Sequence, residues 1–209
     1  PQNSLRYGGV ILMTLVIGYL SARPVLRWYY DATEMKDNTL TQKSIDVMKK
    51  LDGPLTITTY INMLDEDYFR GMPRYYNEDF ERFEKFVRFK PEMKLKYVYY
   101  YDKVQNSSLD RRYPGLSDEE RLAKICEVEE WDVKDILTPE EIHKIEDLSG
   151  EYNKFARVIE RGNGQKSILR IYDDNMRHPS ETEITAAFKR MVIKSPMVAF
   201  LEGHGERSI

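Results

Sequence analysis

The chain has 209 residues, of which 41% are hydrophobic and 32% are charged. This composition excludes a disordered chain, and a mean hydropathy of −0.61 excludes a protein built from many membrane spans. The net charge of −3 predicts no broad basic surface, so nucleic acid is not an expected partner. The single cysteine, Cys126, excludes an internal disulfide and a metal site made only of cysteines.

An uncharged apolar segment near the N-terminus, GGVILMTLVIGYL at residues 8–20, differs from the rest of the chain. Extended to residues 7–27, it reaches the roughly 20 residues, about 30 Å, that a membrane-spanning helix needs. Tyr7 and Trp28 would supply aromatic residues at the two interfaces. We therefore predict a transmembrane anchor at 7–27, after a leading segment at 1–6. A cleaved signal peptide and a buried core helix are the alternatives.

The next segment is predicted to begin with a juxtamembrane helix within residues 31–52. Thr41 is a suitable N-cap, and Ile45 with Met48 begins an apolar stripe at helical spacing. Residues 55–61 then read LTITTYI, a sequence rich in β-branched residues that is typical of a strand.

A second helix is expected after Asn77, and KLKYVYYY at residues 94–101 indicates a second strand. This strand–helix–strand order favours a parallel pair joined by a right-handed crossover. Residues 102–150 are predicted to form an acidic helical insertion. It contains two capping-box sequences, the first of them Ser117 with Glu120.

The C-terminal part predicts a hairpin, a helix and a last strand. The sequence GNG at residues 162–164 is typical of a tight hairpin turn, and Ser180 with Glu183 forms another capping box. Residues 197–201 form an apolar run that predicts the last strand. The complete order is β–α–β, helical insertion, β–β–α. It predicts an α/β fold in which the anchor precedes a thioredoxin-like domain at residues 54–194.

A redox-active thioredoxin carries Cys-x-x-Cys after its first strand. The corresponding residues 62–67 read NMLDED and hold no sulfur nucleophile, so redox chemistry is not expected. Cys126 lies in an amphipathic stretch and is interpreted as a packing residue. The acidic triplet at 65–67 is interpreted as a solvated loop, because it lacks the further oxygen ligands of a calcium-binding loop.

One site-like sequence, EGHGE, follows the predicted last strand. Its members are Glu202, Gly203, His204, Gly205 and Glu206. A histidine between two carboxylates can bind a metal ion or transfer a proton, and the glycines allow a ligand to approach the backbone. We favour the simpler interpretation, a strand-exit turn with solvated charges. His143, on a charged helix, and His178, in a loop, lack metal-ligand spacing, so we predict no catalytic residue, metal or cofactor.

The chain begins at Pro1 without an initiator methionine and stops directly after the predicted last strand. We therefore expect it to be a piece of a longer polypeptide, so that part of the function lies in residues that precede or follow it.

Two parts of the chain resemble one family. The first part comprises the anchor and the motifs RW at 27–28, DATE at 31–34, NTLT at 38–41 and LDGPLTIT at 51–58. The second is the strand and turn MVAFLEGHGE at 197–206. Both are similar to the gliding-motility-associated ABC transporter auxiliary proteins, the GldG-like family, over residues 7–62 and 180–206. The insertion between them carries no motif of that family.

The resemblance implies a non-enzymatic, membrane-anchored accessory protein that works beside an ABC permease and its ATPase. It implies a location at the bacterial inner membrane, with bilayer contact through residues 7–27 and an extracytoplasmic (periplasmic) domain. It also implies that residues 196–209 begin a second, glutamine-amidotransferase-like domain. The residues GHGE at 203–206 are a family signature without an established chemical role.

A second hypothesis, from a different class, is an envelope ligand-binding protein or enzyme. Its site would form around the turn at 202–206 together with a missing downstream domain. The accessory protein is expected to form a stable complex with transporter subunits and to tolerate the loss of His204. In the second hypothesis, His204→Ala would leave folding intact and abolish ligand or metal binding.

Overall fold

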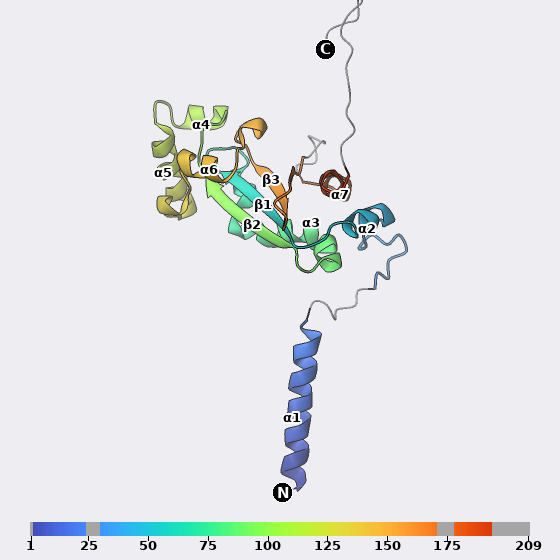
Figure 1. Cartoon of the computed structure of the whole chain (residues 1–209). Coiled ribbons are helices and arrows are strands. Elements are labelled where there is room, and N and C mark those ends of the chain that lie inside the picture. The colour runs from blue at the N-terminus through green and yellow to red at the C-terminus, as the bar shows by residue number, and fades with distance from the viewer. Residues whose placement is uncertain (1, 24–29, 171–177, 194–209) are drawn as a thin grey trace, which may run out of the picture.

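The computed structural model describes residues 2–23, 30–170 and 178–193. Its helices are α1 Gln2–Ser21, α2 Gln42–Met48, α3 Tyr76–Phe89, α4 Ser107–Arg112, α5 Asp118–Glu129, α6 Pro139–Ile145 and α7 Glu181–Arg190. Its strands are β1 Leu55–Asn62, β2 Lys94–Tyr100, β3 Ala156–Arg161 and β4 Lys166–Ile168. The predicted order of strand, helix, strand, helical insertion, hairpin and helix is confirmed (Figure 1).

The four strands form one mixed sheet in the order β2-β1-β3-β4. β1 pairs in parallel with β2, which confirms the predicted crossover pair, and runs antiparallel to β3. β3 and β4 form the antiparallel hairpin. Because β1 and β2 are parallel, their carboxyl ends lie at the same edge of the sheet. The insertion with α4, α5 and α6 gathers at this end, and α2 and α7 lie towards the opposite end (Figure 1).

Alternating residues of β1 contribute to packing on both faces of the sheet. Leu55 and Ile57 belong to a cluster with residues of α2, α3 and α7, in which Phe86 and Phe188 meet edge to face at 5.5 Å. On the other face, Tyr60 packs in a cluster that includes Ile142 of α6 and other residues from the insertion and the strands. The insertion therefore covers part of the second face.

Local sequence signals predicted the starts of three helices and the hairpin turn. The capping boxes of α5, α6 and α7 are all present. Gly164 adopts a positive φ of 83° in the hairpin turn, as that turn requires. Two boundaries differ from the prediction. α3 begins at Tyr76 and so includes Asn77. The strand expected at residues 166–172 is present as β4 over Lys166–Ile168, and residues 171–172 lie outside the described part of the chain.

The predicted anchor at 7–27 does not match α1 at either end. α1 spans Gln2–Ser21, and residues 24–27 lie outside the described part of the chain. Among the described residues, no helix is both long enough and apolar enough to cross a membrane. The predicted transmembrane helix is therefore not supported. The uncharged run begins after Arg6 and α1 ends at Ser21, whereas a span needs roughly 20 apolar residues.

The predicted juxtamembrane helix at 31–52 is also shorter than expected. α2 covers only Gln42–Met48, and Thr41 caps it as predicted. The residues before it form turns around Asp31, whose carboxylate accepts hydrogen bonds from Thr33, Asn38 and Thr39. These bonds lower the pKa of Asp31 to about 2, and the bond from the Thr33 hydroxyl has the largest effect.

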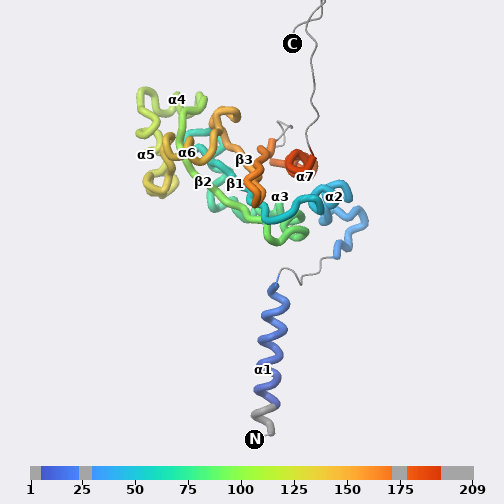
Figure 2. Tube along the Cα trace, viewed as in Figure 1, coloured from blue at the N-terminus to red at the C-terminus, as the bar shows by residue number. Residues whose placement is uncertain are grey.

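α2 and α7 are joined by a polar clamp around Glu181, and Figure 2 shows the two helices side by side. The Glu181 carboxylate accepts hydrogen bonds from the Thr41 backbone at 2.8 Å and from the Ser44 hydroxyl at 2.6 Å. Burial works to raise the pKa of Glu181, but the bonds from Ser44 and Thr41 outweigh it and lower the pKa below its usual value of 4.5.

This clamp gives a testable pH dependence. A carboxyl whose pKa is lower in the folded state adds stability above its unfolded-state pKa and loses that contribution as the pH falls through its folded-state pKa. We expect Glu181→Gln to lower the melting temperature near neutral pH, and the difference from the wild type to shrink below about pH 4.5. Thermal denaturation followed by circular dichroism measures both. Glu140→Gln, at an exposed position of α6, is the control, and a pH-independent difference for Glu181→Gln would contradict the prediction.

Candidate functional site

The structure does not describe the part of the chain that contains the predicted site. Glu202, Gly203, His204, Gly205 and Glu206 lie outside the described residues, as does the predicted domain start at 196–209. Of the three histidines, His143 and His178 are described, and they lie in different parts of the fold. The strongest polar cluster among the described residues lies instead at the carboxyl edge of β1 and β2, where α/β sheets commonly place their ligands.

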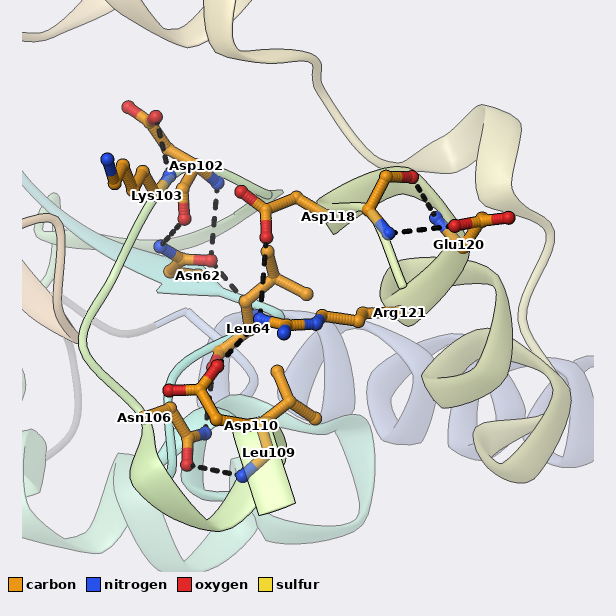
Figure 3. A network of polar contacts seen from close by, with 11 residues as sticks. Asn62, Leu64, Asp102, Lys103, Asn106, Leu109, Asp110, Asp118, Glu120 and Arg121 are labelled. Atoms are coloured by element: carbon orange, nitrogen blue, oxygen red, sulfur yellow. Dashed lines mark hydrogen bonds and ion pairs between the residues drawn. The ribbon is translucent and has the colours of Figure 1, made fainter. Parts of the chain in front are cut away.

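Asn62, the last residue of β1, organises this edge (Figure 3). Its fully buried amide donates to the backbone carbonyls of Asp102, at 2.9 Å, and Asn153, at 2.8 Å. Its oxygen accepts from the backbone N–H groups of Leu64, at 3.0 Å, and Asp102, at 3.4 Å. Both donors and both acceptor positions of the side chain are therefore used. One side chain ties together the three segments that leave or enter the sheet at this edge.

Asp102 extends the cluster towards the insertion. One carboxylate oxygen bonds to Nε2 of His143 at 2.6 Å and accepts from the Asn153 amide at 3.0 Å, and the other accepts from the Lys103 backbone at 2.7 Å. His143 is exposed, but it is not simply solvated, because it pairs with this buried carboxylate. Asn153 reaches the site through a left-handed backbone conformation with φ of 54°.

The interpretation of the acidic triplet at 65–67 as a solvated loop is wrong for Asp65. The residue is only 2% exposed. Its Oδ2 accepts a hydrogen bond from the Phe155 backbone at 2.9 Å, but its Oδ1 has no hydrogen-bond partner among the described residues. Burial raises the pKa of the Asp65 carboxyl, and the bond from Phe155 only partly opposes this shift. Asp67, in contrast, pairs with Arg70 at 2.7 Å.

A cavity of about 370 Å³ lies beside Asp65. It is bounded by the loop after β1 and by α4 and α5. Asn106 holds one wall in place, because its amide donates to the Leu64 carbonyl at 2.9 Å while its oxygen caps α4 at Leu109, 3.0 Å away (Figure 3). Asp65 therefore lies beside a partly open cavity.

No family model, curated protein or solved structure matches this chain. The resemblance to the GldG-like family therefore stays a prediction, and the functional argument rests on the geometry of the described residues.

A second buried polar group lies away from this edge, between α3 and β3. Arg157 is 4% exposed and pairs with Asp79, which is 2% exposed and also accepts a 2.8 Å hydrogen bond from the Tyr97 hydroxyl. His178 lines a small cavity of about 150 Å³ nearby. Burial, followed by the positive charges of nearby arginines, lowers the pKa of His178. The contacts of Asp79 with Arg157 and with Tyr97 hold α3 to the sheet.

The described residues include no group of three or more side chains of the kind that holds a metal ion. Cys126 is buried in the cluster between the loop after β1 and α5, which confirms its interpretation as a packing residue. Sequence reasoning missed Asn62 and Asp102. The available signal was that each polar residue directly follows the apolar part of a strand, and the two strands were predicted to be parallel.

Proposed function

We propose that the chain is a non-enzymatic, membrane-attached accessory component of an ABC transport or gliding-motility-type system, located at the bacterial inner membrane with its α/β domain on the extracytoplasmic side. It would work through contacts with the permease and ATPase subunits. The family resemblance suggests this role, and the surface of α1 supports membrane attachment.

The observation that carries the proposal is the exposure of apolar side chains along α1. Val10, Leu12 and Leu15 are each 64 to 65% exposed. Ile11 and Met13, which point in other directions around the helix, are also more than 60% exposed. No residue of α1 belongs to the apolar clusters of the described α/β domain. A helix that is apolar on all sides is stable when an apolar environment surrounds it, and a bilayer provides one.

The polar edge of the sheet supports a non-enzymatic role. Asn62 uses both donors and both acceptor positions of its amide on backbone groups. A side chain saturated in this way positions loops and is poorly suited to transfer protons or attack a substrate. We also infer that the domain is thioredoxin-like, which the sheet order β2-β1-β3-β4 supports, with β3 antiparallel to both of its neighbours.

Membrane fractionation followed by affinity purification in mild detergent tests the proposal. In cells that naturally produce the protein, the wild type is expected to sediment with the membranes and to co-purify with an ABC permease and ATPase. Ile11→Lys with Leu15→Lys is expected to release it, because each substitution puts a charge on the exposed apolar surface that would contact the bilayer. Ile145→Lys, at an exposed apolar position of α6, is the matched control and should stay in the pellet.

Two outcomes would contradict the proposal. Recovery of the wild type in the soluble fraction would exclude membrane attachment. Retention in the membrane without permease and ATPase in the purified complex would exclude the transport role while leaving attachment intact.

A further inference from the structure

The Asp65 carboxyl joins two loops at the carboxyl edge of β1 and β2. Asp65 lies in the loop after β1, and its Oδ2 accepts a hydrogen bond from the backbone of Phe155, which directly precedes β3. The residue is almost fully buried, and Oδ1 has no hydrogen-bond partner among the described residues. One hydrogen bond does not replace the hydration that an ionised carboxylate loses on burial. The site therefore accommodates the neutral carboxyl better than the charged one.

The charged groups closest in the sequence to the two loops do not reverse this preference. Burial has the largest effect on the pKa of Asp65 and raises it, and the bond from Phe155 is the next effect and opposes the shift. Asp67, in the same loop, raises the pKa further, whereas Lys154, next to Phe155, lowers it. Lys154 is exposed, so water screens its charge.

The other elements around Asp65 offer no buried cation among the residues that face it. Glu66 and Arg112 line the neighbouring cavity, and both are exposed to solvent. On the sheet side, the titratable group is Tyr100 of β2. Burial first, and then the charges of Asp102 and Asp65, raise the pKa of Tyr100, so its hydroxyl stays neutral between pH 4 and pH 8.

The segment before β3, to which Asp65 is bonded, has a strained backbone. Tyr152 and Asn153 are consecutive non-glycine residues with positive φ angles of 57° and 54°. Such a backbone persists where the surrounding contacts hold it in place. The Asn153 carbonyl accepts a hydrogen bond from Asn62, and the Asn153 amide donates to Asp102. Asp65 supplies a further contact to this segment, so a change that favours exposure of Asp65 also favours release of the segment.

We propose that Asp65 is a pH-sensitive latch between the loop after β1 and the segment before β3. While the carboxyl is neutral, the two segments stay docked. At higher pH the carboxyl gives its proton to the solvent, and the buried charge favours undocking, which returns the carboxylate to water and lets Tyr152 and Asn153 relax. This regulation goes beyond the accessory role and does not depend on it.

The melting temperature of the full chain in mild detergent, followed by circular dichroism from pH 4 to pH 8, tests the proposal. A carboxyl whose pKa is higher in the folded state adds stability below its unfolded-state value of 3.8, and this contribution is lost as the pH rises through the folded-state pKa. The melting temperature of Asp65→Asn minus that of the wild type should therefore rise by about 2 °C or more between pH 4 and pH 8. Glu66→Gln, at the exposed neighbouring position, is the matched control, and its difference should vary by less than about 1 °C.

Hydrogen exchange of the wild type locates the effect in the structure. The protection factor compares the exchange rate of an amide with that of an unstructured peptide at the same pH. For the Phe155 amide we expect it to fall by about threefold or more between pH 5 and pH 8. The fall should be smaller at Ile57, a buried residue within β1, and absent in Asp65→Asn.

Two results would overturn the proposal. The first is a melting-temperature difference between Asp65→Asn and the wild type that does not change with pH. The second is a protection factor of Phe155 that stays constant or that falls only in step with that of Ile57. If Asp65→Asn does not fold, the exchange measurement on the wild type still decides the question.

Discussion

Replacing Asp79 with alanine is expected to lower the free energy of unfolding by about 3–5 kcal/mol. Arg157 lies almost fully buried between α3 and β3, and Asp79 is its buried counter-ion. Removing the carboxylate leaves a guanidinium charge without compensation in a site that excludes water. It also removes the acceptor of the Tyr97 hydroxyl. Urea denaturation followed by tryptophan fluorescence measures the change.

The neighbouring residue supplies a matched control. Glu78 forms an ion pair with Arg82 at 2.8 Å, but its side chain is 57% exposed. Glu78→Ala should therefore change the free energy of unfolding by less than about 0.5 kcal/mol. The double variant Asp79→Ala with Arg157→Met should recover part of the loss, because the unpaired charge is gone. A loss below about 1 kcal/mol for Asp79→Ala would contradict the assignment of a buried ion pair.

Asn62→Ala is expected to lower the free energy of unfolding by about 3 kcal/mol. The substitution removes the amide's bonds to two carbonyl groups and two N–H groups, of which only the Asn153 carbonyl keeps another partner, the Tyr100 hydroxyl at 3.0 Å. Each buried group that stays unpaired costs about 1–3 kcal/mol, and water entering the space would offset part of the sum. Urea denaturation measures the loss, and hydrogen exchange should show faster opening of the loop after β1.

Gln105→Ala is the control for this prediction. Gln105 lies in the same connecting segment as Asp102 and Asn106 but is exposed. Its replacement should change stability by less than about 0.5 kcal/mol. Equal stability of Asn62→Ala and Gln105→Ala would mean that the amide does not hold the three segments together.

The sequence predicted those parts of the fold that depend on near neighbours. Ser117 with Glu120 and the GNG turn at 162–164 act over three or four residues, so their signals are present in the sequence itself. The strand and helix order followed from periodicity. The extent of α2 did not, because hydrogen bonds to Asp31 organise the preceding residues as turns instead of a longer helix.

The candidate site and the buried ion pair could not be predicted in this way. Arg157 and Asp79 are 78 positions apart, and nothing in either local sequence marks the charge as buried. Asp65 illustrates the same limit. An acidic triplet in a loop is usually solvated. Asp65 is buried instead, and its carboxylate accepts a hydrogen bond from the backbone of Phe155, which directly precedes β3 and lies 90 positions away in the sequence. Burial of a polar group is a property of the assembled fold.

The position of β1 in the sheet has a consequence for folding kinetics. Its pairing with β2 joins residues about 40 positions apart, whereas its pairing with β3, as in Leu55 with Arg161, joins residues about 100 positions apart. The pair of β1 and β2 can therefore form early together with α3. The hairpin of β3 and β4 pairs with β1 only after a much longer loop has closed. The entropy of loop closure grows only slowly with length, by about 0.6 kcal/mol for each doubling. The insertion at 102–150 therefore delays the assembly of the sheet more than it weakens it.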